Sequence, residues 1–138
     1  MTESTPYPIA VDPLKVGSYP ARAASGGGLV WDAVLEYRVW CHPPGGDDDS
    51  FRAFATYDEA LAFASSTPGT EDPVALVRQD EHIDEPEPGK FIHVKTPRTT
   101  EWPVEFLRRP RRTSHTIPDF LSPTAPANRL EILRGVAR

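Results

Sequence analysis

Cysteine is almost absent from this chain of 138 residues, which contains Cys41 alone. A single thiol cannot form an internal disulfide framework, and this composition favours a reducing compartment. Long apolar runs are absent too, since none approaches the about 18 residues that cross a membrane. The opening residues, MTESTPYPIAVD, do not place an apolar stretch after a basic one, as a signal peptide does. We therefore expect a cytoplasmic protein without a membrane partner.

Proline, in contrast, is abundant, with 16 residues in 138 against an average of about 5%. Each proline removes a backbone donor and is disfavoured in helix interiors and central strands. Much of the chain must therefore lie in loops, sheet edges or extended arms. The length suits one domain, which could bury about two-thirds of its unfolded surface.

Residues 34–42, VLEYRVWCH, alternate in a pattern typical of a half-buried β-strand. One predicted face holds Leu35, Tyr37, Val39 and Cys41, and the other holds Glu36, Arg38 and Trp40. The turn-forming, acidic loop PPGGDDDS separates this strand from residues 51–55, FRAFA. We expect the two segments to pair as a hairpin.

Residues 57–66 form the clearest predicted helix. Thr56 and Glu59 have the spacing of a capping box, and Pro68 with Gly69 ends the pattern. Apolar residues recur at i, i+3, i+4 and i+7, which places them on one helical face. These residues are Tyr57, Ala60, Leu61 and Ala64.

Residues 73–96 predict a second hairpin, with the strands PVALVRQDEHI and KFIHVKT on either side of the turn DEPEPG. Residues 100–107, TEWPVEFL, favour a short edge element, because Pro103 is disfavoured in a central strand. Strands in adjacent pairs with one helix between them predict an α+β fold, a small antiparallel sheet with one main helix packed on one face. We assign this core domain to residues 29–107.

Extended, proline-rich arms are expected at both ends of the core, over residues 1–28 and 108–138. In the first arm, isolated apolar residues such as Ile9 and Leu14 cannot bury a face by themselves, so the arm either lies along a surface or is disordered. The second arm ends in a short predicted helix with Asn128 as its N-cap. A helix this short must dock on the domain or on a partner.

Charge is divided unevenly along the chain. Residues 108–138 contain seven arginines and two carboxylates, a net charge of +5, whereas residues 1–107 carry a net charge of −10. Four of the arginines fall within five positions, at Arg108, Arg109, Arg111 and Arg112. Such clusters can bind phosphates, but no nucleic-acid-binding module accompanies this one. We therefore predict a docking arm for an acidic protein surface, belonging to this domain, a second copy or a partner.

Three further residues are candidates for interaction. Trp40 falls on the polar face of its strand, so we expect an arm or an interface to cover it. Phe120 and Leu121 lie in a proline-rich stretch and would be costly to leave in water.

Metal ligation is the weaker interpretation of the histidines. His82 and His93 face each other across the predicted hairpin among carboxylates, which suits either a divalent cation or a solvated acidic hairpin end, and we favour the latter. Cys41 and His42 are adjacent and should point to opposite faces, so they cannot easily share a metal. We expect no metal, and a buried, inert thiol at Cys41 in preference to a nucleophile.

Five stretches of the sequence carry a resemblance: VLEYRVWCHPPGG, FATYDEALAFASSTPG, EHIDEPEPG, TEWPVEFLRRPRRT and IPDFLSPTAPANRLEILRG. They resemble a small alphaproteobacterial family commonly labelled GNAT-type N-acetyltransferases. The resemblance implies a bacterial cytoplasmic protein with an acyltransferase activity that uses acetyl-CoA. Enzymes of that type hold the cofactor pyrophosphate in a glycine-rich loop between a strand and a helix. The nearest stretch here is residues 22–28, RAASGGG, with Ser25 at the position of the first glycine.

The residues themselves favour a protein–protein interaction or regulatory module, with self-association among its forms and no cofactor. An acetyl-CoA-dependent N-acetyltransferase is the alternative, and a nucleic-acid-associated regulator is the second alternative. An enzyme should contain a concave pocket with perturbed titratable groups. A binding protein should expose an apolar patch around Trp40 or exchange its arms between chains.

Overall fold

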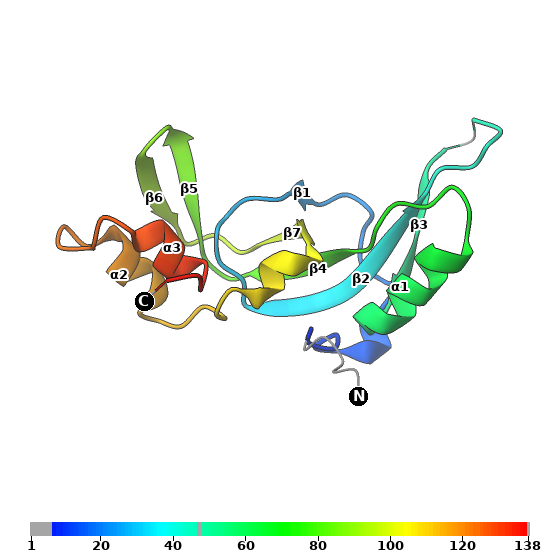
Figure 1. Cartoon of the computed structure of the whole chain (residues 1–138), viewed down its shortest axis with the longest axis horizontal. Coiled ribbons are helices and arrows are strands. Elements are labelled where there is room, and N and C mark those ends of the chain that lie inside the picture. Colours follow the sequence, from blue (N-terminus) through cyan, green and yellow to red (C-terminus); the bar gives the residue numbers. More distant parts are fainter. Residues whose placement is uncertain (1–6, 47, 138) are drawn as a thin grey trace.

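The computed structural model describes residues 7–46 and 48–137. A five-stranded sheet lies at the centre, and a separate two-stranded sheet lies at one end of the long axis (Figure 1). The strands are β1 (Ala24–Ser25), β2 (Ala33–Cys41), β3 (Ser50–Phe54), β4 (Val74–Gln79), β5 (His82–Glu87), β6 (Lys90–Val94) and β7 (Arg98–Pro103). The helices are α1 (Tyr57–Ser66), α2 (Thr116–Leu121) and α3 (Arg129–Leu133), with the 3-10 helices η1 (Pro13–Lys15) and η2 (Val104–Arg108).

The five-stranded sheet has the order β1-β7-β4-β2-β3. Its pairs are antiparallel apart from the two-residue strand β1, which runs parallel to β7. The main helix, α1, follows β3 and packs against β2 and β3 (Figure 1). The predicted α+β fold with one main helix is confirmed, and the segment before β2 makes the sheet mixed by adding β1 to its far edge.

The predicted hairpin of β2 and β3 is confirmed, with Tyr37 opposite Phe54. The predicted faces are wrong near the start of β2, because the register with β4 shifts between Val34 and Glu36. An extra residue in one strand reverses the alternation of side chains beyond it. Val34 therefore joins Tyr37 in the main core, in the place predicted for Leu35.

α1 covers the predicted residues 57–66. The Thr56 hydroxyl accepts a hydrogen bond from the Glu59 backbone N–H at 3.2 Å, as in a capping box. The Glu59 carboxylate accepts from the same hydroxyl at 2.9 Å. The buried face differs at one position, since Phe63 packs on the core and Leu61 is 40% exposed. The Phe63 ring contacts Phe54 of β3, with the ring centroids 5.4 Å apart.

The predicted hairpin over residues 73–96 is confirmed for its turn and returning strand, β5 and β6, but is wrong in its first half, because the predicted first strand divides at Asp80. β4 lies between β2 and β7 in the main sheet, whereas β5 leaves that sheet and pairs with β6. The backbone N–H of Asp80 donates to the Asp32 carboxylate at 2.6 Å. This hydrogen bond holds the chain at the point where it turns away from the main sheet.

β7 lies inside the main sheet, between β1 and β4, and the prediction of an edge element is wrong. β1 pairs with Thr100 and Glu101 only, whereas Pro103 pairs with Val74 of β4 at the end of β7. No third strand therefore lies beside Pro103 in the described sheet. A proline is tolerated there because its missing N–H has no ladder hydrogen bond to make.

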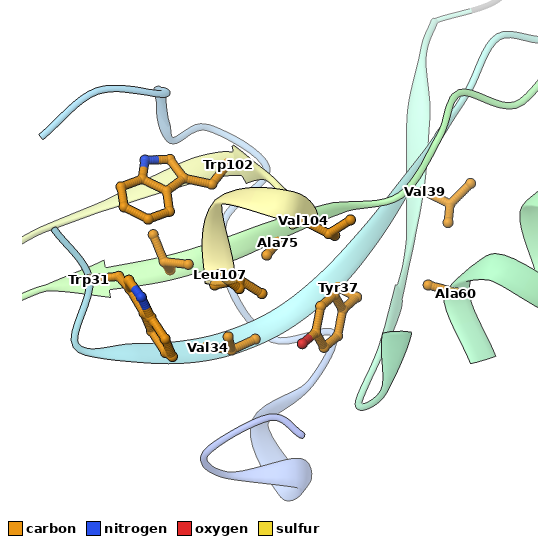
Figure 2. Packing of buried hydrophobic residues seen from close by; sticks show 10 residues of the cluster. Trp31, Val34, Tyr37, Val39, Ala60, Ala75, Trp102, Val104 and Leu107 are labelled. Atoms are coloured by element: carbon orange, nitrogen blue, oxygen red, sulfur yellow. The ribbon is translucent and has the colours of Figure 1, made fainter. Parts of the chain in front are cut away.

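The main core lies between one face of the sheet and the elements that cover it. Figure 2 shows this core extending from Trp31 and Trp102 at one end to Val39 and Ala60 at the other. Val104 and Leu107 of the 3-10 helix η2 are buried in this core, so η2 covers the part of the sheet face that α1 does not reach.

A second core joins the β5–β6 hairpin to α2 and α3, and we call this unit the small lobe (Figure 1). Its buried members are Val30, Ile83, Ile117, Phe120 and Leu133. The rings of Phe91 and Phe120 pack edge to face at 5.0 Å across the contact between β6 and α2. The basic C-terminal segment is thus part of a packed unit.

Residues 7–28 of the predicted N-terminal arm lie along the main sheet, and residues 1–6 fall outside the described chain. The backbone N–H groups of Ala10 and Val11 donate to the carbonyls of Ala55 and Val34, each at 2.8 Å. In the C-terminal segment α3 follows Asn128 as predicted, without a capping hydrogen bond from its side chain. No helix among the described residues is both long and apolar enough to cross a membrane.

Candidate functional site

Two of the four clustered arginines have hydrogen-bonding partners within the domain, whereas Arg108 and Arg111 lie over the Tyr7 and Trp31 rings. Arg112 donates from Nε to the Asp32 carboxylate at 2.9 Å, and only 15% and 8% of these side chains are exposed. The Arg109 guanidinium lies 4.0 Å from the centre of the Phe106 ring and donates to the Leu29 carbonyl at 3.3 Å. Both arginines therefore fix the C-terminal segment to the protein's own surface.

The other two arginines of the cluster, Arg108 and Arg111, are exposed, and so is Arg134 after α3. Within residues 7–46 and 48–137, no carboxylate lies within 4.0 Å of these three guanidinium groups. We call Arg108, Arg111 and Arg134 the basic rim. The Arg111 guanidinium lies 5.1 Å from the centre of the Trp31 ring, and this contact limits its freedom.

Residues distant in sequence meet at the basic rim. A Cβ atom on Gly135 would lie 2.9 Å from Pro110 Cδ and 3.6 Å from the Arg108 carbonyl oxygen, so the end of α3 adjoins the start of the C-terminal segment. Burial, and after it the charge of Arg134, lowers the pKa of Arg109. Positive charge from both ends of the segment is therefore concentrated in one place.

A pocket of about 230 Å³ opens between α2 and α3. We call it the α2–α3 pocket. Its lining is formed by Pro110, Thr116, Asp119, Phe120, Pro126, Arg129, Ile132 and Leu133. Five of these eight residues are apolar, and Pro110 and Leu133 each precede a rim arginine. The pocket is therefore suited to an apolar group whose surroundings are polar.

Two charged residues border the pocket. Arg129 donates from Nη1 to the Phe120 carbonyl at 2.9 Å, and its guanidinium lies 4.5 Å from the Phe120 ring centre and 5.1 Å from that of Phe91. It is therefore held against the wall of the pocket. Asp119 is exposed and offers a carboxylate at the opening.

The predicted interaction residues Phe120 and Leu121 lie beneath the site, in or against the second core. Phe120 is 4% exposed and lies in the second core, and Leu121 packs against that core. Neither side chain stands free on the surface. Their contribution is to position α2, which forms one wall of the pocket.

Trp40 makes its contacts within the chain. Its Nε1 donates to the Glu101 carboxylate at 3.0 Å, and its ring lies 5.1 Å from that of Phe51. Glu101 also accepts a hydrogen bond from Arg38 at 3.0 Å, and Arg38 is paired with Glu36 at 2.7 Å. Trp40 therefore belongs to an ionic network on the sheet face opposite the main core.

The N-terminal segment covers Glu36 and Arg38 in this network, and the predicted cover over Trp40 itself stays a prediction. Glu36 and Arg38 are fully buried. The backbone N–H of Gly17 donates to Glu36 at 2.8 Å, and Arg38 donates to the carbonyls of Pro20 and Ala21 at 2.5 and 3.1 Å. These backbone groups replace the water that two buried charges would otherwise need.

The two histidines weighed as metal ligands lie on opposite faces of the β5–β6 hairpin. His93 pairs with Ile83 and His82 pairs with Val94, and neighbouring strand residues point to opposite faces. His93 contacts the Glu81 carboxylate at 2.5 Å, whereas burial lowers the pKa of His82. Among the described residues, no three His, Cys, Asp or Glu side chains are grouped as a metal site requires.

Cys41 and His42 also have separate environments. The half-buried Cys41 thiol lies 3.7 Å from the Val39 carbonyl oxygen. The exposed His42 ring lies between Asp49 and Glu71 and contacts a carboxylate at each nitrogen. Hydrogen bonds to Asp49 first, and then to Glu71, raise the pKa of His42.

The glycine-rich stretch of residues 22–28 contains β1, and its three glycines lie between β1 and β2, without a following helix. Its carbonyl groups accept hydrogen bonds from side chains of the sheet. Thr100 donates to the Gly26 carbonyl at 2.9 Å, and the Trp102 indole donates to the Gly27 carbonyl at 2.9 Å. In this arrangement the stretch connects β1 to the main core.

Comparison with known proteins identifies no relative, since no family model, curated protein or solved structure matches the chain significantly. The basic rim and the α2–α3 pocket are therefore interpreted from their own geometry. Sequence reasoning found the arginines and missed the pocket, whose walls come from Pro110 and from two short helices. The available signal was Pro118, Pro123 and Pro126, because proline is disfavoured in helix interiors and so limits the length of the helices here.

Proposed function

We propose that this chain is a protein–protein interaction module and that the α2–α3 pocket with its basic rim is the docking site. The observation that carries the proposal is an apolar pocket in a chain of net charge −5, two of whose lining residues, Pro110 and Leu133, directly precede exposed arginines that have no carboxylate partner among the described residues. The single cysteine supports action in a reducing compartment such as the cytoplasm.

The partner defined by this chemistry is an acidic protein segment that carries one large apolar side chain. Burial of a leucine contributes about 1.5–3 kcal/mol, and each exposed ion pair at the rim contributes about 0–1 kcal/mol. With three such pairs the sum is at most about 6 kcal/mol, so the dissociation constant of an isolated peptide should be no lower than about 0.04 mM. The rim charges mainly accelerate association and make it sensitive to salt.

A labelled peptide with one leucine flanked by glutamates tests the proposal by fluorescence anisotropy. Replacement of Arg108, Arg111 and Arg134 by alanine should weaken binding about tenfold, as should Pro126→Trp, which fills the pocket. A matched triple replacement of Arg22, Arg52 and Lys95 changes the net charge equally and should leave binding within about twofold. Equal losses in the two triple variants would refute the site, because they would show a response to net charge alone.

Two further measurements separate the alternatives. A single-stranded oligonucleotide that binds more tightly than the peptide, with a steep dependence on salt, would favour the nucleic-acid-associated regulator. Acetyl-CoA at about one hundred times its dissociation constant would stabilise the folded state by about 2.7 kcal/mol. A rise of several degrees in the thermal midpoint with millimolar acetyl-CoA would therefore favour the N-acetyltransferase.

A further inference from the structure

The N-terminal segment presents one apolar side chain almost entirely to water. Leu14 is 95% exposed, the most exposed of the large apolar side chains described. It lies in η1, where the Asp12 carboxylate accepts a hydrogen bond from the Leu14 backbone N–H at 3.2 Å. The Lys15 N–H donates to the Asp12 carbonyl at 3.0 Å. Leu14 is therefore displayed at the tip of a structured turn.

Both sides of this turn are attached to the main sheet. Before it, the Val11 N–H donates to the Val34 carbonyl at 2.8 Å, and after it the Gly17 N–H donates to the Glu36 carboxylate at 2.8 Å. The conformational entropy of presenting Leu14 is thus lost on folding, before any partner binds. Such preorganisation reduces the cost of association.

The α2–α3 pocket is large enough for this side chain. A cavity of about 150 Å³ lined by apolar side chains can hold benzene, and the pocket here measures about 230 Å³. Phe120, Ile132 and Leu133 provide apolar contacts for the four carbons of a leucine side chain.

The charges around Leu14 complement those around the pocket. Asp12 and Lys15 flank Leu14 at the tip of the turn. The pocket has Arg134 of the basic rim beside it and the exposed Asp119 carboxylate at its opening. Each charge at the tip therefore finds an opposite charge at the pocket.

Leu14 cannot reach the pocket of its own chain. Figure 1 shows η1, in blue, below the main sheet beside α1, whereas α2 and α3 lie at the far end of the long axis. Both segments are held by hydrogen bonds or core packing to separate parts of the structure. Contact between them therefore requires two molecules.

We propose that Leu14 of one copy inserts into the α2–α3 pocket of a second copy. The inference rests on the proposed function, because it names an occupant of that same site, whose apolar side chain is flanked by one charge of each sign in place of an acidic sequence. The two contacting surfaces differ, so the interface is head to tail and joins copies into a ring or a chain. One leucine with two flanking ion pairs makes this association weak and dependent on concentration.

Sedimentation velocity over a range of protein concentrations tests the proposal. The wild-type protein should rise above its monomer mass of 15.3 kDa as concentration increases. Leu14→Ser should weaken self-association at least about tenfold. Leu61→Ser is the matched control, because Leu61 is also exposed but lies on α1, and it should associate as the wild type does. Wild-type-like association of Leu14→Ser would overturn the proposal.

A mixing experiment gives the sharper result. Leu14→Ser retains the pocket, and Pro126→Trp retains Leu14, so each variant alone should remain a monomer. An equal mixture should form a one-to-one dimer and nothing larger, because only one of its two possible contacts is intact. A mixture that stays monomeric would contradict the head-to-tail arrangement.

The peptide assay keeps the two proposals distinguishable. Leu14→Ser has an intact pocket and should bind the acidic leucine peptide. If it does so while the wild-type protein remains a monomer at every concentration, the self-docking inference is wrong and the proposed function stands. If the variant binds no peptide, both are wrong.

Discussion

Gly28→Ala is expected to destabilise the protein by about 3–5 kcal/mol. Gly28 has a φ of +82°, and an added Cβ would lie 2.8 Å from both Cδ and Oε1 of the fully buried Gln79, and closer still to Nε2. The left-handed backbone contributes about 1–2 kcal/mol of strain for a residue with a Cβ. Displacement of Gln79 adds the loss of its hydrogen bonds, at about 1 kcal/mol each.

The hydrogen bonds at risk are specific. Gln79 donates from Nε2 to the carbonyls of Gly27 and Val30 at 3.0 and 2.9 Å, and its Oε1 accepts from Arg98 at 2.7 Å. Urea unfolding followed by tryptophan fluorescence measures the loss, with unchanged m-values as a check on two-state behaviour. Gly26→Ala is the control, because Gly26 has a φ of +73° and an added Cβ there would meet no other atom within 4 Å. Equal destabilisation by both variants would refute the role assigned to Gln79.

Two further predictions concern buried and exposed charge. Arg38→Met should lower the free energy of unfolding by about 3–5 kcal/mol, because it leaves the fully buried Glu36 carboxylate unpaired. Arg78→Met removes a half-exposed ion pair with Asp80 and should lower it by less than about 1 kcal/mol. Equal losses of the two variants in urea unfolding would contradict this prediction. His42 has a raised pKa, so its stabilising contribution is complete below about pH 6.5 and is lost as the pH rises through the folded-state pKa. The thermal midpoint of the wild-type protein should therefore exceed that of His42→Gln by more at about pH 5.5 than at about pH 8.5. A difference that is the same at both pH values would contradict this prediction.

The helix and the first hairpin could be predicted because local signals define them. The Thr56–Glu59 capping box fixes the start of α1, and alternation identifies β2. The division between β4 and β5 could not be predicted in the same way. Residues 74–83 contain no proline or glycine that would mark a break. The break depends on Asp32, which lies far away in the sequence and binds the Asp80 N–H. Tertiary contacts of this kind leave no local pattern.

The bulge in β2 likewise shows that tertiary pairing decides which side chains share a face of the strand. Leu35 and Val34 are both apolar, so sequence alternation alone cannot decide which of them joins Tyr37 in the core. The register with β4 decides it, because pairing shifts by one residue between Val34 and Glu36. A face predicted from alternation is therefore reliable only as far as the pairing is regular.

The arginine cluster shows how a charge run divides once the chain is folded. Arg109 and Arg112 contact Leu29, Phe106 and Asp32, and these contacts attach the C-terminal segment to the domain. Arg108 and Arg111 remain at the surface on either side of Pro110, and α3 then brings Arg134 beside them. Docking on this domain is the role of Arg109 and Arg112. The proposed docking on another protein is assigned to the exposed arginines alone. The variants that remove only the exposed members test the second role without disturbing the first.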